Sequence, residues 1–93
     1  MVIGVLTLDL YIGGACSLKD KRRVVKSILT RAGNQFNISV AEVGNNDLWQ
    51  RATIGAVCLS NETSHVHSIL SNVVKFVEKQ GDVEILDYRT EVI

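Results

Sequence analysis

A dense cluster of basic residues is the part of this sequence best suited to chemistry. Six of the ten lysines and arginines fall between positions 19 and 31, where the only acid is Asp20. This window carries six minus one, or +5, so the rest of the chain carries −5 to give the formal net charge of zero. The field near a surface follows charges within about a Debye length, roughly 8–10 Å. The window can therefore attract a polyanion although the whole chain is neutral.

The cluster coincides with a predicted helix that follows Ser17, a suitable N-cap, and ends at Gly33-Asn34. Its apolar stripe is Leu18, Val25, Ile28, Leu29 and Ala32. Most of the cations project away from this stripe, with Lys21 nearer the boundary. A solvated helix face usually mixes both signs, whereas this face has a single acid. We therefore expect a site for RNA phosphates or other anions formed by Lys19, Lys21, Arg22, Arg23 and Lys26.

A loop before this helix offers a second possible anion site. Gly13-Gly14 could present backbone N–H groups to an anion at the helix start. The loop lacks the spacing of a P-loop, and residues 13–17 contain no arginine such as small acylphosphatase-like enzymes use to bind phosphate. A small anion-binding enzyme of that architecture is therefore the third-ranked reading, and we expect no catalytic residues.

Other reactive side chains are isolated. His65 and His67 lie two residues apart on a predicted helix and would point in nearly opposite directions, whereas helical metal pairs use a spacing of four. Cys16 and Cys58 form no CxxC pair, and neither thiol has a neighbouring base in the sequence. We therefore expect no metal site, no cofactor and reduced thiols in a cytoplasmic protein.

The elements that position these residues follow from hydrophobic periodicity. Alternating apolar residues predict strands at 2–12, 36–43, 48–59 and 83–93, with a hairpin connection at 44–47. A second helix follows the capping groups at 60–63, with an apolar stripe at Val66, Ile69, Leu70, Val73, Val74 and Val77. The order strand, helix, strand, strand, helix, strand predicts an α+β, ferredoxin-like βαββαβ domain. Its four-stranded antiparallel sheet would carry both helices on one face.

Such a two-layer domain leaves the other sheet face open. Ile3, Val5, Val57 and Leu59 would make part of that face apolar, so we expect it to be covered in a homo-oligomer. An RNA-stacking platform built from Tyr11 and Trp49 is less favoured. These aromatics lie at strand ends, and the sequence contains no RNP pattern.

Two blocks of the sequence resemble a known family. Ser17-Leu18-Lys19-Asp20-Lys21-Arg22-Arg23 is similar to the S-L-K-x-K-R signature of the YlxP-like family of uncharacterised small bacterial proteins, with Asp20 where Glu is expected. Residues 40–43 and 47–52 resemble the second block of that family, and the likeness extends over essentially the whole chain. The resemblance implies a ferredoxin-like fold and a gene position among translation and ribosome-maturation genes. It implies no particular reaction.

Composition sets the remaining limits. Ninety-three residues with 46% hydrophobic content, 22% charged residues and no proline indicate one globular domain spanning 1–93. No apolar run approaches the roughly 20 residues of a membrane span, and the N-terminal strand lacks the basic region of a signal peptide. The leading interpretation is a non-enzymatic binding protein that contacts RNA or ribosomal particles through its first helix. The alternative is an oligomeric protein-interaction scaffold without a nucleic-acid role.

Overall fold

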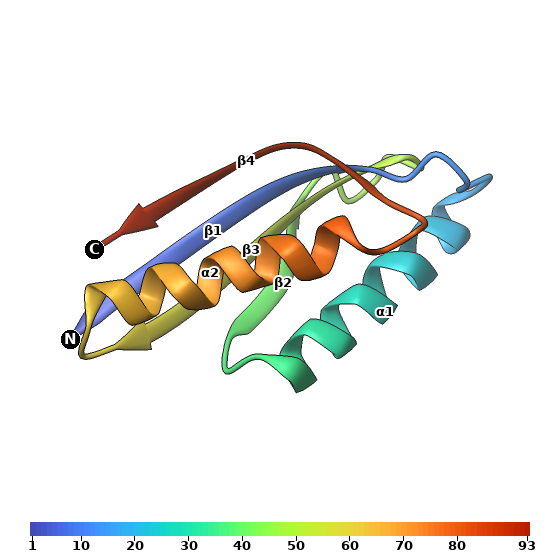
Figure 1. The fold of residues 1–93 in the computed structure, drawn as a ribbon. Helices are drawn as coiled ribbons and strands as arrows, with labels where there is room; N and C mark the ends of the chain where they lie inside the picture. The colour runs from blue at the N-terminus through green and yellow to red at the C-terminus, as the bar shows by residue number, and fades with distance from the viewer.

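Four strands and two helices make up the chain, as the computed structural model of residues 1–93 shows (Figure 1). The elements are β1 (Val2–Tyr11), α1 (Leu18–Gln35), β2 (Ser39–Gly44), β3 (Arg51–Ser60), α2 (Thr63–Glu78) and β4 (Glu84–Val92). This confirms the predicted element order and the ferredoxin-like α+β class. Neither helix is long and apolar enough to cross a membrane.

The sheet has the strand order β2-β3-β1-β4, and all three pairings are antiparallel. Both helices lie on the same side of the sheet, and the other face carries no further element (Figure 1). Side chains along β1 alternate as the sequence pattern requires, with Leu6, Leu8 and Leu10 buried beneath the helices. Because the pattern has a period of two, the residues between these leucines lie on the open face.

Helix α2 packs closely onto the middle of the sheet. Its buried stripe consists of Val66, Leu70, Val73, Val74 and Val77. The approach is tightest at Gly4 of β1, where an added Cβ atom would lie 2.3 Å from Val66 Cγ1 and 3.0 Å from Leu70 Cδ1. Glycine at this position therefore sets the distance between α2 and the sheet.

Several element boundaries differ from those predicted, and β2 begins at Ser39 rather than at residue 36. Helix α1 continues past Gly33-Asn34 to Gln35, and the Phe36 N–H still donates to the Ala32 carbonyl (2.9 Å). Gly33 has a negative φ, so it does not form the left-handed turn that commonly ends a helix. Strand β3 begins at Arg51, which leaves Trp49 in the preceding loop with 58% of its surface exposed.

Candidate functional site

The basic helix begins with a reciprocal cap that uses its only acid. Ser17 Oγ accepts a hydrogen bond from the Asp20 N–H (3.1 Å), and Asp20 Oδ2 accepts one from the Cys16 N–H (3.2 Å). This arrangement resembles a capping box with Asp in the position usually taken by Glu or Gln, except that the carboxylate accepts from Cys16, the residue before the N-cap, and not from Ser17 itself. A carboxylate in the first helical turn is also favoured by the helix dipole. The departure of Asp20 from the expected Glu is therefore compatible with a capping role.

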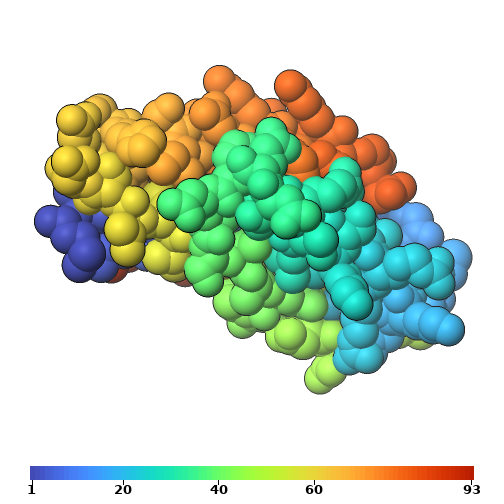
Figure 2. Space-filling view, turned by 90° about the horizontal axis from the view of Figure 1, so that it is seen from below, coloured from blue at the N-terminus to red at the C-terminus, as the bar shows by residue number.

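Four of the five predicted anion-binding residues lie together on the outer face of α1. Lys19, Arg22, Arg23 and Lys26 are all exposed. Figure 2 shows α1, coloured cyan to green, crossing the molecular face opposite the sheet with no other segment over it. Arg23 approaches Asp20 at 4.0 Å, the limit of an ion pair, while Lys19, Arg22 and Lys26 pair with no carboxylate. Three cations are thus free to contact an external anion.

Lys21 is the exception, and the prediction for this residue was wrong. Its side chain has no solvent exposure, and its ammonium lies 2.6 Å from Glu42 Oε2 on β2. The same nitrogen donates to the carbonyl oxygens of Asn45 (3.1 Å) and Asn46 (3.2 Å). An ammonium has three donors, and these three acceptors use all of them. Lys21 therefore has no donor left for a phosphate.

The burial of Lys21 follows from its spacing along the helix. Lys21, Val25, Ile28 and Ala32 stand at i, i+4, i+7 and i+11, and all four are buried. A residue advances by about 100° per position, so Lys21 lies at the centre of this stripe rather than at its boundary. The spacing was visible in the sequence, but its partner Glu42 was not singled out there.

The anchored loop connects α1 to polar groups on the open sheet face. Asn45, with a φ of 58°, donates from Nδ2 to Thr53 Oγ1 (3.0 Å). Thr53 Oγ1 in turn donates to Asp9 Oδ1 (2.9 Å). The chain Lys21, Asn45, Thr53, Asp9 thus fixes the β2–β3 loop to both layers. It is a structural network, since each buried polar side-chain atom has a partner.

Arg31 also belongs to the basic window but has another environment. It donates to Gln80 Oε1, two residues after the end of α2, and its guanidinium carbon lies 5.9 Å from the centroid of the Phe76 ring. These contacts hold the two helices together. We therefore leave Arg31 out of the candidate anion surface.

The four predicted oligomer residues are brought together on the open face. Ile3 lies directly opposite Leu59, and Val5 lies directly opposite Val57, in the β1–β3 ladder. Leu59 is 63% exposed and Val57 is 41% exposed. The remainder of the face is more polar, because Asp9, Thr53 and the charged side chains of β4 occupy it. Self-association through this patch stays a prediction.

The geometry gives little support to the two alternative sites, the Gly13-Gly14 anion loop and the aromatic RNA platform. The hollow beside Gly14 has a volume of about 290 Å³, but Asp20 and Asp82 line it together with Arg23, so carboxylates would face an incoming anion. On the open face, Tyr11 stands at the strand end opposite Arg51, while Trp49 lies in a loop outside the sheet. The two aromatics therefore do not stand on adjacent central strands, as base stacking on an RRM sheet requires.

The isolated reactive residues remain apart in space. Burial raises the pKa of the Cys58 thiol, while a hydrogen bond with the Gly4 backbone opposes this shift. Cys16 is exposed, and its thiol donates to the Gly14 carbonyl. His65 Nδ1 lies 3.0 Å from Ser60 Oγ, and His67 is exposed on α2. The fold forms no group of three or more metal-ligating side chains.

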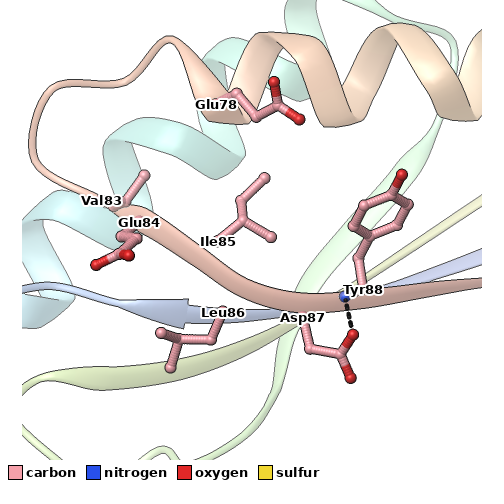
Figure 3. A pocket seen from close by; sticks show the side chains of 7 residues that line it. All are labelled: Glu78, Val83, Glu84, Ile85, Leu86, Asp87 and Tyr88. Atoms are coloured by element: carbon pink, nitrogen blue, oxygen red, sulfur yellow. Dashed lines mark hydrogen bonds between the residues drawn. The ribbon is translucent and has the colours of Figure 1, made fainter.

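A further hollow of about 510 Å³ lies beside β4, between its first half and Glu78 at the end of α2 (Figure 3). Its charged residues are Glu78, Glu84 and Asp87, with no cation among the lining side chains. No residue of α1 lines this acidic hollow. The molecule is therefore dipolar, as the charge distribution along the sequence indicates.

Comparison with known proteins gives a family but no activity. The uncharacterized protein YlxP of Bacillus subtilis (strain 168) is 38% identical over 90 residues, which are 97% of this chain and 98% of that protein. A de novo designed protein, Foldit4, shares the fold with a TM-score of 0.57 at 13% identity, covering 98% of this chain and 97% of the designed one. The profile of the family described as "protein of unknown function (DUF503)" matches residues 3–90. The chain belongs to this family, which confirms the YlxP-like resemblance seen in the two sequence blocks.

Proposed function

We propose that this protein is a non-enzymatic binding protein that contacts RNA phosphates through the outer face of α1. The observation that carries the proposal is the set of four exposed cations, Lys19, Arg22, Arg23 and Lys26, of which three have no acidic partner. We call this set the α1 basic face. Structural burial accounts for Lys21, and helix capping accounts for Asp20. Neither burial nor helix capping explains the four cations of the α1 basic face.

The geometry of the α1 basic face suits a row of phosphates better than a single small anion. Lys19, Arg22 and Lys26 follow one another at about one turn, so their charges are spaced along the helix by roughly 5 Å. No hollow with a cationic lining encloses a ligand there; the nearest one is lined by Asp20 and Asp82 as well as Arg23. An exposed convex strip of cations matches an extended polyanion, because each cation can neutralise a separate phosphate.

Ribosomal RNA is the form of RNA that we favour. The resemblance to YlxP-like proteins implies a gene position among translation and ribosome-maturation genes, and the basic face supplies the matching chemistry. Phosphate contacts position a protein without reading bases, so this surface by itself predicts little sequence preference. Selectivity for a particular RNA sequence or shape would come from other contacts on the ribosomal particle.

Binding to a ribosomal RNA fragment at several salt concentrations tests the proposal. The logarithm of the association constant should fall linearly with the logarithm of salt, with a slope near −0.7 to −0.9 for each phosphate neutralised. Absence of measurable binding at low salt would refute the proposal and favour the protein-interaction scaffold.

A matched pair of double variants locates the surface. Arg22→Ala/Lys26→Ala removes two cations at positions four apart on α1. Lys75→Ala/Lys79→Ala removes two at the same spacing, one in the last turn of α2 and one at its C-cap. All four side chains are exposed, so both variants should keep the thermal stability of the parent chain. The first should weaken binding on the order of tenfold or more at low salt and reduce the salt slope by about 1.4. Equal effects of the two variants would contradict the assignment to α1.

A further inference from the structure

The outer edge of β4 carries backbone N–H and C=O groups that form no hydrogen bonds with another strand. Ile3 and Ile93 exchange both of their backbone hydrogen bonds, at 3.1 Å and 2.8 Å. Because strand backbone groups alternate in direction, residues 87, 89 and 91 also point their N–H and C=O groups toward β1. Tyr88, Thr90 and Val92 therefore direct theirs outward. In agreement, the Tyr88 N–H donates to its neighbour Asp87 Oδ1 (2.9 Å; Figure 3).

This edge differs from the edge on the opposite side of the sheet. Strand β2 has six residues, and its pairing with β3 is interrupted between Glu42 and Gly44. Strand β4 has nine residues, and the register shift near Asp9 and Leu10 leaves the pairing from Asp87 to Val92 regular. Long regular edges are templates for another strand, whereas short or bulged edges resist pairing. β4 is therefore the edge that can accept a partner.

The side chains of β4 make this edge complementary to itself. Asp87, Arg89 and Glu91 follow one another on the open face in the order acid, base, acid. In an antiparallel pair of two β4 strands with its two-fold axis at Thr90, Arg89 of each copy lies opposite Glu91 of the other. Opposite charges placed directly across two strands stabilise the pair. A partner strand with a different charge order would not gain both contacts.

The helix side of β4 is also incompletely covered. Tyr88 is 51% exposed and Val92 is 40% exposed, and a hollow of about 400 Å³ lies between α2 and the Tyr88–Thr90 segment. In the same two-fold register, Tyr88 of one copy lies opposite Val92 of the other. Pairs of an aromatic and a β-branched residue are favourable across antiparallel strands. Both sides of the edge therefore support one register.

We propose that a second copy of this chain pairs with the outer edge of β4, antiparallel and centred on Thr90, to form a continuous eight-stranded sheet. Tyr88 would exchange hydrogen bonds with Val92 of the second copy, and the two Thr90 residues would exchange theirs with each other. The Tyr88 N–H leaves Asp87 and donates to the carbonyl of Val92 in the second copy. A single two-fold axis closes this assembly as a dimer.

Charge-reversed variants test both the surface and the register. Arg89→Glu and Glu91→Arg change exposed side chains and should fold as the parent chain does, which circular dichroism can check. Sedimentation equilibrium of the parent chain at micromolar concentration should give about 20 kDa, twice the 10.2 kDa of one chain. Each single variant puts like charges opposite each other and should weaken the dimer by about tenfold or more. An equimolar mixture of the two should restore it as a heterodimer.

A backbone variant gives an independent readout. Thr90→Pro removes one outward N–H without touching the bonds to β1, and proline is accepted on edge strands with this orientation. The variant should fold and be monomeric at concentrations where the parent chain is a dimer.

Three results would overturn the proposal: a parent chain that is monomeric throughout the micromolar range, single charge variants that dimerise as strongly as the parent chain, or a mixture that fails to form the heterodimer. Loss of dimerisation in Arg89→Glu but not in Glu91→Arg would also overturn the Thr90 register, since a pairing centred on Tyr88 opposes Arg89 to Asp87.

Discussion

Lys21 of α1 and Glu42 of β2 form an ion pair of 2.6 Å, although the lysine belongs to the most basic stretch of the chain. The pair joins the first helix to the edge strand beneath it. Because the same ammonium also binds two carbonyl oxygens of the β2–β3 loop, one side chain fixes three segments. A lysine in a basic helix can thus stabilise the fold while its neighbours remain available to a partner.

Replacing Lys21 with Met should destabilise the protein. The change leaves the mostly buried Glu42 carboxylate and two backbone carbonyls without their donor, and breaking a buried ion pair costs about 3–5 kcal/mol. Because Glu42 retains 15% exposure, we expect a value near the lower end. Urea denaturation measures the free energy of unfolding. The control Lys26→Met alters an exposed side chain and should change this free energy by less than about 0.5 kcal/mol.

The double variant Lys21→Met/Glu42→Leu should recover much of the lost stability, because apolar replacements of similar volume can substitute for a buried pair. Both Lys21 variants should bind RNA as the parent chain does at temperatures where they are folded. A folded Lys21→Met protein that loses RNA affinity as strongly as Arg22→Ala/Lys26→Ala would return Lys21 to the binding surface.

The fold followed from the sequence because its periodicities are regular. The alternating leucines of β1 and the apolar stripe of α2 can be buried in only one orientation of each element. The element order and the face of the sheet that the helices cover could therefore be predicted. Lys21 could not be placed by its residue type, since lysines are almost never fully buried unless paired. Its partner Glu42 lies 21 residues away, and their contact depends on how α1 crosses β2.

The free backbone edge of β4 could not be predicted from the sequence, for a different reason. Alternation predicts which side chains of residues 83–93 share a face, but it does not say which backbone groups point away from β1. That information comes from the bonds between Ile3 and Ile93. The exposed aromatic Trp49 was likewise assigned to a strand by its parity, whereas β3 begins two residues later.

A single added methyl group at Gly4 should loosen the two layers. Gly4→Ala places a Cβ atom against Val66 and Leu70 of α2, and overpacking a close-packed core costs about 1–3 kcal/mol. We expect a lower urea midpoint with an unchanged slope. The control Gly14→Ala has no atom within 4 Å of the added Cβ atom, so it should leave the midpoint nearly unchanged. Equal stability of the Gly4→Ala and parent proteins would contradict the close approach.

The two cysteines should differ in reactivity. Cys58 is buried and its pKa lies above the ordinary thiol value, whereas Cys16 is exposed. Since the thiolate is the reacting form, a disulfide reagent at pH 8 should modify one thiol per folded chain and two in denaturant. Cys16→Ser should abolish the rapid reaction, and Cys58→Ala should preserve it. Rapid modification of both thiols in the folded protein would show that the core opens near Cys58.

The raised pKa of Cys58 also predicts the sign of one pH effect. A thiol whose pKa is higher in the folded state favours folding below its unfolded pKa, and this contribution declines as pH rises through the alkaline range. Stability should therefore fall more steeply above about pH 8.5 in the parent chain than in Cys58→Ala. Urea midpoints measured from neutral to alkaline pH check this. Parallel pH profiles for the two proteins would exclude a contribution from Cys58.

The apolar patch formed by Ile3, Val5, Val57 and Leu59 lies on the open face of β1 and β3, beside β4 but not on its outer edge, and predicts a second association step. A β4-paired dimer would present two copies of this patch, so further association into a larger closed assembly should follow as concentration rises. Val57→Glu places an unpaired carboxylate in that contact and should remove the larger species while leaving the dimer intact. The control Ser68→Glu adds the same charge at an exposed position of α2 and should remove neither the dimer nor the larger species. Light scattering distinguishes these cases, and a mass that never exceeds that of the dimer at any concentration would leave the patch without a role in self-association.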